Sequence, residues 1–235
     1  MEEVKIVEKS EKLISIIIPL GPGDSISSAL KAFLDSLDNN NAIEVVIVAY
    51  DHESLDGFKN KFKYNIVGHQ GTRASSLNLG SLVAEGEYLL FLHSDSYMEK
   101  SSFDVLMKRI LKEQSALFYF DFRFTKGVPF YFKFTEIGVR FRCAVFKTPF
   151  GDQGLTISKE NFNKMGKYNL KVPFGEDHYL VKECKAHNMD ILSVNEILYT
   201  SPRKYLAMGW LKATIYHQLM WYRQILDFKK GKYRK

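Results

Sequence analysis

The chain has 235 residues, of which 46% are hydrophobic and 26% charged, a composition that indicates one folded domain with a substantial core and excludes extensive disorder. No apolar run approaches the roughly 18 residues of a membrane-spanning helix, so we expect no transmembrane segment. The net charge of +6 comes from residues 201–235, which contain nine Lys or Arg and one acid. Because no nucleic-acid recognition module accompanies these charges, we expect no nucleic-acid binding.

The N-terminal half of the chain alternates continuous apolar runs with amphipathic segments. The apolar runs predict buried strands at residues 13–20, 43–49, 65–68 and 88–92. Apolar residues three or four positions apart predict helices at residues 25–37, 75–84 and 101–114. Asp24 is the expected N-cap of the first helix. This alternation predicts an α/β fold with a Rossmann-like, mostly parallel sheet flanked by helices.

The order of elements changes in the C-terminal half. The expected elements are a strand at 116–124, a helix at 130–146, a loop at 150–154, a helix from 176, a strand at 191–199 and an amphipathic helix at 206–228. Arg140 and Arg142 are expected to be solvated residues of the helix at 130–146. We divide the chain into a main α/β domain, residues 1–205, and a C-terminal amphipathic helix with a basic tail, residues 206–235.

Polar residues follow the predicted strands where ligands of such sheets bind, beyond the carboxyl ends. Asp51 and His52 follow the second strand, and His93 and Asp95 follow the strand at 88–92. A nucleoside diphosphate needs a divalent cation held by hard oxygen ligands, with positive groups nearby. Asp95 and Arg73 supply a carboxylate and a guanidinium, so the sequence predicts a diphosphate site at this edge.

Residues 71–98, GTRASSLNLGSLVAEGEYLLFLHSDSYM, resemble the family 2 glycosyltransferases. They are most similar to a small bacterial branch whose pattern runs Gly-Arg-Ala-x-Gln-Met-Asn-x-Gly and then Leu-Phe-Leu-His-Ala-Asp-Thr. Further motifs agree in order: the first strand, residues 51–54 with the Asp-Gly-Gly-Ser of the family, Gly-Asp-Gln-Gly at 151–154, and the Glu-Asp pair at 176–177. The resemblance covers about residues 13–226, nearly the whole chain.

This resemblance implies a GT-A fold, with a nucleotide-sugar half at about residues 13–100 and an acceptor half at about 115–205. The implied activity is metal-assisted, inverting transfer of a hexose-like sugar from a nucleoside diphosphate-sugar to a hydroxyl acceptor, such as a glycan or a lipid-linked sugar. The implied cofactor is a divalent metal, Mn²⁺ or Mg²⁺.

The resemblance also implies roles for single residues on the donor side. Asp51 would hydrogen-bond the base, with Pro19 beside it. Asp95 would bind the metal and the diphosphate, and Arg73 would lie near the phosphate or the sugar. Arg203 stands where relatives carry an Arg-Arg-Trp element that contacts the phosphates.

On the acceptor side, Asp177 would be the general base, supported by Glu176. Asp152 and Gln153 would contact the acceptor. His93 stands where the family has the first Asp of Asp-x-Asp, so one carboxylate is missing; its imidazole is either a metal ligand or a structural residue.

Two other functions compete with sugar transfer. A sugar-phosphate nucleotidyltransferase would need a basic, glycine-rich loop after the first strand, and residues 20–26 contain no Lys or Arg. A nucleotide-sugar-binding module without activity is favoured by the missing carboxylate at His93, and disfavoured by Asp95, Arg73 and Asp177.

The last helix carries an apolar stripe: Leu211, Ile215, Leu219, Tyr222 and Leu226. Such a stripe is typical of a core or homodimer contact, whereas Trp210, Trp221 and the basic tail favour a membrane surface. Residues 1–12 are charged and do not resemble a signal peptide, and Cys143 and Cys184 have no metal-ligand spacing. We therefore expect a cytoplasmic protein with reduced cysteines. The last helix leaves core, homodimer contact and membrane surface as alternatives, the last of which would place the protein peripherally at the inner membrane face.

Overall fold

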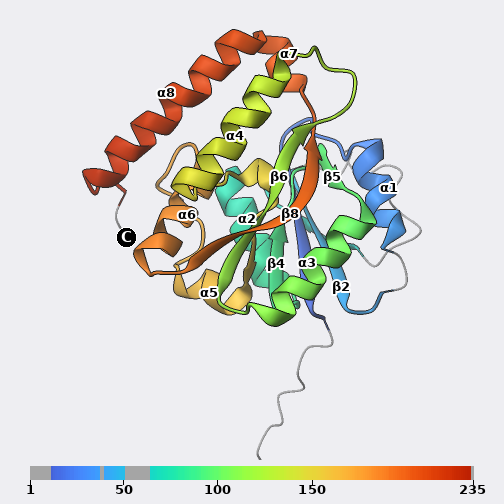
Figure 1. Ribbon diagram of the computed structural model, residues 1–235. Helices are drawn as coiled ribbons and strands as arrows, with labels where there is room; N and C mark the ends of the chain where they lie inside the picture. Colours follow the sequence, from blue (N-terminus) through green and yellow to red (C-terminus); the bar gives the residue numbers. More distant parts are fainter. Residues whose placement is uncertain (1–11, 38–39, 51–63, 234–235) are drawn as a thin grey trace, which may run out of the picture.

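The computed structural model describes residues 12–37, 40–50 and 64–233 (Figure 1). Its elements in chain order are β1 (Ile14–Leu20), α1 (Ser28–Ser36), β2 (Ile43–Ala49), β3 (Tyr64–Gly68), α2 (Arg73–Val83), β4 (Tyr88–Phe91), β5 (Ser96–Met98), α3 (Lys100–Lys112), β6 (Ala116–Phe124), α4 (Phe132–Phe146), the 3-10 helix η2 (Gly151–Gln153), β7 (Thr156–Ser158), α5 (Lys159–Lys164), α6 (Glu176–Ala186), β8 (Asp190–Thr200), α7 (Arg203–Met208) and α8 (Trp210–Lys229).

The strands form one mixed sheet of eight strands in the order β3-β2-β1-β4-β7-β6-β8-β5. Strands β3, β2, β1 and β4 are parallel to one another, as predicted for the N-terminal half. In the C-terminal half, β7 runs antiparallel to both β4 and β6, and β5 runs antiparallel to β8, while β6 and β8 are parallel. The α/β class is therefore confirmed, with the parallel strands concentrated in the first half.

Helices cover both faces of the sheet because each central strand is apolar on both sides. Alternate residues of β1 divide between the two faces: Ile16 and Ile18 pack with α1 and α3, whereas Ile17 packs with α2, α5 and α6. A third, aromatic cluster of Phe122, Phe124 and Phe132 lies under α4, α7 and α8. This layering leaves the carboxyl ends of the strands at one edge of the sheet.

Two helix starts differ from the sequence prediction. Helix α1 is capped by Ser27, whose hydroxyl accepts a hydrogen bond from the Leu30 N–H at 3.2 Å. Asp24 instead closes the turn before it, where its carboxylate accepts from the Gly21 N–H at 3.1 Å. Helix α2 begins at Arg73, two residues earlier than predicted, because Thr72 caps it. This earlier start places Arg73 in the first turn of α2.

The predicted C-terminal helix is two helices, α7 and α8, joined at Gly209, which has φ 84°. Few residues other than glycine adopt this conformation, so the chain changes direction there. Helix α8 then runs beside α4 in the same direction (Figure 1). The Trp210 indole N–H donates to the Thr135 hydroxyl at 2.9 Å, and the Phe146 and Trp221 rings lie 5.9 Å apart.

Among the residues that the structure describes, no helix combines the length and apolar character required to cross a membrane. Cys143 and Cys184 are both buried and neither is in a disulfide.

Candidate functional site

The main candidate site is a cavity of about 520 Å³ between the carboxyl edge of the sheet and helices α4 and α8. Its floor comes from the N-terminus of α2, the turn after β4, η2 and the N-terminus of α6. Its walls come from α4, α7 and α8, with Phe134, Val139, Trp210 and Trp221 among the apolar residues. Segments far apart in the chain therefore meet around one polar floor with largely apolar walls.

A cluster of charged residues forms the floor. Arg73 pairs with Glu176 at 3.1 Å between Nη1 and Oε1, and its Nη2 also donates to Nε2 of His93. Asp177 follows Glu176 in the first turn of α6, and its Oδ2 accepts a hydrogen bond from the Gly151 N–H. The resemblance assigned these residues to one site, and the structure brings all four side chains to one cavity.

Gly151 lies close to two of these charged side chains, which would have to shift to admit a larger residue. A Cβ atom there would lie 2.6 Å from Oδ2 of Asp177 and 2.9 Å from Nη2 of Arg73. Gly175, with φ 77°, turns the chain into α6 and so brings Glu176 and Asp177 to the cavity. The glycines of both motifs thus hold the carboxylates and the guanidinium together.

Asp152 is the most perturbed acid in the cavity. Burial raises its pKa from 3.8 to about 6, although Arg142 opposes the shift. Its Oδ1 atom is buried and has no hydrogen-bond partner among the described residues. An unsatisfied carboxylate oxygen in a cavity is costly for folding, and such groups concentrate at functional sites.

Arg142, predicted to be solvated, is buried instead, and that prediction was wrong. Its Nε donates to the Thr148 carbonyl at 3.0 Å and its Nη2 to Oε1 of Gln153 at 3.1 Å, while its guanidinium lies 3.6 Å from the Phe150 ring centroid. The loop at 147–150 folds back over α4 and covers this side chain, which helical spacing alone does not reveal.

Gln153 is also buried, with 1% of its surface exposed. Its amide donates to the Phe120 carbonyl at 3.0 Å and its Oε1 accepts from the Phe150 N–H at 3.1 Å, besides Arg142. It does not line the cavity, in contrast to Asp152. The side chain therefore fixes the η2 turn that presents Asp152.

The predicted metal ligands differ in their availability. Burial and the nearby Arg73 lower the pKa of His93 well below 6.5, so the imidazole is neutral, and its Nε2 lone pair already accepts from Arg73. Asp95 lines the cavity with an oxygen donor suited to Mn²⁺ or Mg²⁺. Within residues 12–37, 40–50 and 64–233, no three His, Cys, Asp or Glu side chains are grouped to hold a metal. Of the two predicted ligands, Asp95 alone therefore offers a donor atom that Arg73 does not occupy.

Two other predicted donor residues, Pro19 and Arg203, do not line the cavity. Pro19 is in β1 and does not line the cavity. Arg203 is exposed and pairs with Asp24 at 3.5 Å, while its neighbour Lys204 lines the cavity in its place. Asp51 lies outside the described residues.

Asn78 and Gly80, which also carry the resemblance, have structural roles. The Asn78 side chain exchanges two hydrogen bonds with the backbone of Tyr168, at 2.9 and 3.0 Å, and so fixes the loop that precedes α6. A Cβ atom at position 80 would lie 2.5 Å from Cγ2 of Ile17, so only glycine lets α2 pack closely on β1. Both residues help to set the position of Arg73 relative to Glu176.

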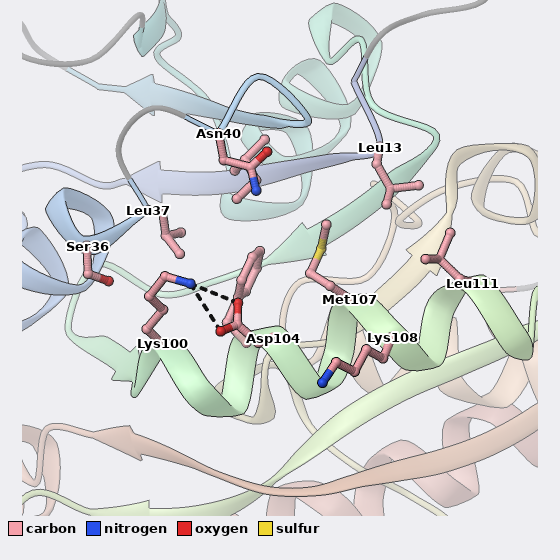
Figure 2. Close-up of a pocket in the computed structure, with 11 residues that line it drawn as sticks. Leu13, Ser36, Leu37, Asn40, Lys100, Asp104, Met107, Lys108 and Leu111 are labelled. Carbon is pink, nitrogen blue, oxygen red and sulfur yellow. Dashed lines mark hydrogen bonds and ion pairs between the residues drawn. The ribbon is translucent and has the colours of Figure 1, made fainter.

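A second hollow, of about 650 Å³, lies at the opposite end of the parallel strands (Figure 2). It is lined by Leu13, Leu37 and residues of α3, including Lys100 and Asp104, which pair along the helix at 3.0 Å. None of the predicted site residues lines it, so we place the functional site in the cavity beside α4 and α8.

No protein-family model and no curated protein sequence matches the chain. Among solved structures it is similar to S. aureus TarS, a glycosyltransferase, with TM-score 0.59 and 16% identity over 86% of this chain and 39% of TarS. For TarS 1–349 the TM-score is 0.61 and the identity 17%, over 86% of this chain and 64% of that one. For the complex of TarS 1–349 with UDP-GlcNAc, the TM-score is 0.57 and the identity 17%, over 80% of this chain and 56% of that one.

The chain thus spans less than two thirds of the length of each of these structures. At this level of identity the similarity establishes the fold. The chain has the α/β, GT-A-type fold that the sequence motifs predict.

Proposed function

We propose that this protein is an inverting glycosyltransferase that moves a hexose-like sugar from a nucleoside diphosphate-sugar to a hydroxyl acceptor. The observation that carries the proposal is the cluster of Arg73, Asp152, Glu176 and Asp177 in one cavity at the carboxyl edge of the sheet. The fold adds support, because solved structures of the similar protein TarS contain UDP-GlcNAc or UDP.

The donor diphosphate would lie against the N-terminus of α2 and Arg73. Backbone N–H groups and the positive end of the helix dipole favour an anion there. Lys204 lines the same cavity and adds a second positive charge. Asp51 and Pro19 remain the residues proposed to contact the base.

Asp177 is the proposed general base. It would take the proton of the acceptor hydroxyl while the acceptor oxygen forms a bond to the anomeric carbon. The bond from that carbon to the diphosphate oxygen breaks in the same displacement, and the diphosphate leaves with the electron pair. One in-line displacement inverts the anomeric configuration. Glu176 would position Arg73 through their 3.1 Å ion pair.

Asp95 is the residue proposed to hold a divalent metal, with His93 as a second ligand only if its Nε2 is released from Arg73. A bound Mn²⁺ or Mg²⁺ would supply positive charge for the departing diphosphate. Arg73 and Lys204 would add to that charge from the protein.

Asp152 is the proposed acceptor contact, because its buried Oδ1 lacks a partner that an acceptor hydroxyl would supply. Gln153 would act indirectly, by holding the η2 turn in place. Aromatic walls from α4 and α8 favour an acceptor with sugar rings or apolar parts.

Thermal-shift titration with UDP, GDP, CDP and dTDP, each with and without Mn²⁺ or Mg²⁺, tests the donor site. A ligand at 100 times its Kd stabilises the folded state by about 2.7 kcal/mol, which raises Tm by about 5–10 °C for a chain of this size. We expect such a rise for one nucleotide with metal, its loss in Asp95→Ala, and its retention in Asp35→Ala, which removes an exposed aspartate of α1. No rise with any nucleotide would contradict the proposal.

A further inference from the structure

Helices α4 and α8 expose large apolar side chains to an unusual extent. Four residues of α4 spaced along one side are 55–63% exposed: Phe134, Ile137, Phe141 and Val145. Four residues of α8 are 50–63% exposed: Leu211, Ile215, Leu219 and Tyr222. Single exposed apolar residues are ordinary, but two continuous stripes on neighbouring helices mark an interaction surface.

The two stripes belong to one surface. Contacts near both ends hold the helices side by side, with Trp210 against Thr135 and Trp221 against Phe146 (Figure 1). The inner side of α8 packs on the protein through Ala213 and Gln224, so its stripe points away from the protein. We call this surface the α4–α8 face.

The exposed charges on the α4–α8 face all have one sign. They are Lys133, Arg140, Lys212, Arg223 and Lys229. The two acids of these helices are half-buried and engaged: Glu136 accepts from the Phe124 N–H at 3.0 Å, and Asp227 pairs with Lys232 at 3.6 Å. A second copy of the chain on this face would bring like charges together, whereas a surface of anionic lipids would complement them.

We propose that the α4–α8 face docks the protein on an anionic phospholipid membrane. Apolar and aromatic side chains would enter the interface, while the flanking Lys and Arg contact lipid phosphates. Phe134 of α4 and Gln218 of α8 both line the catalytic cavity and are both exposed, so the opening of the cavity lies at this face. Given the proposed glycosyl transfer, the cavity would then receive hydroxyl acceptors carried by lipids.

Co-sedimentation of the full chain with vesicles tests the docking surface independently of catalysis. We expect binding to vesicles of phosphatidylcholine with 30% phosphatidylglycerol. Binding to pure phosphatidylcholine, or to anionic vesicles in 0.5 M NaCl, should be at least tenfold weaker, because the cations account for much of the attraction.

The double variant Phe141→Glu/Leu219→Glu should lose at least tenfold in vesicle affinity. The matched control Leu111→Glu, which alters an exposed leucine of α3 on the other side of the sheet, should bind like the wild type. Unchanged Tm values in all variants show that folding is intact. Absence of vesicle binding by the wild type would overturn the proposal. So would a wild-type dimer in light scattering that the double variant dissociates, since a second copy would then cover the face.

Discussion

Replacing Asp152 with Asn is expected to stabilise the folded protein at neutral pH while lowering its activity. The Asp152 side chain is half-buried in the cavity with its Oδ1 atom buried, and desolvation raises its pKa from 3.8 to about 6. The folded protein therefore holds this proton more strongly than the unfolded chain does. Stability must fall as the pH rises from about 4 to about 6, because over that range folding keeps a proton that the unfolded chain releases.

The size of the effect follows from the pKa difference. Each pH unit between the two pKa values is worth about 1.4 kcal/mol, so above pH 6 the ionised Asp152 carboxylate lowers the free energy of unfolding by about 3 kcal/mol. Asn carries no charge and escapes this penalty. For a chain of this length we expect Tm of Asp152→Asn to exceed that of the wild type by about 6–12 °C at pH 7.5. The difference should shrink toward zero as the pH approaches 4.

Thermal unfolding of both proteins from pH 4.5 to pH 7.5 measures this difference, with Asp104→Asn as the control. Asp104 is exposed and paired with Lys100, so its replacement should change Tm little at any pH. A lower Tm for Asp152→Asn at pH 7.5, or a difference that does not depend on pH, would refute the reasoning. Either result would mean that the Asp152 carboxylate is satisfied in the folded protein.

Three further substitutions test the rest of the site. Asp177→Asn should reduce kcat, measured by donor turnover, by about 10²–10⁴-fold, while the nucleotide affinity measured by calorimetry stays unchanged. An equal loss of kcat and affinity would contradict the role of Asp177 as a base. Arg73→Lys keeps the charge but loses the two-sided contact with Glu176 and His93, so calorimetry should show about tenfold weaker nucleotide binding. Gln153→Leu leaves the buried partners of Gln153 unpaired, at a cost of about 1–3 kcal/mol each, so Tm should fall by about 6 °C or more. The control Gln114→Leu, at an exposed position, should leave Tm unchanged. Equal Tm values for the two variants would exclude a structural role for Gln153.

The parallel half of the sheet was predictable because its signals are local. Continuous apolar runs identify β1, β2 and β4, and the Asp that follows β4 stands at the correct edge. Arg73 and the Glu176-Asp177 pair lie about a hundred positions apart in the sequence. Local patterns cannot show that such distant residues share one site. Their pairing became visible only through the resemblance and then in the cavity itself.

The rest of the fold and site was not predictable, for several physical reasons. β5 and β7 have three residues each, too few to show any periodicity. The burial of Arg142 depends on a loop that returns over α4. The helix break at Gly209 depends on a positive φ angle, which glycine can adopt but does not always adopt. The exposed stripe of α4 resembles a core-facing stripe in sequence, because spacing does not say which side meets solvent.

The most direct test of the central claim is proton NMR of a nucleotide-sugar incubated with the protein, using the nucleotide that gives the largest thermal shift. The account predicts slow consumption of the donor with water as acceptor, release of the nucleoside diphosphate, and a free sugar that first appears with the opposite anomeric configuration. Asp177→Asn should bind the donor and leave it intact. A sugar released with retained configuration, or a bound donor that the wild type consumes no faster than Asp177→Asn does, would contradict the account.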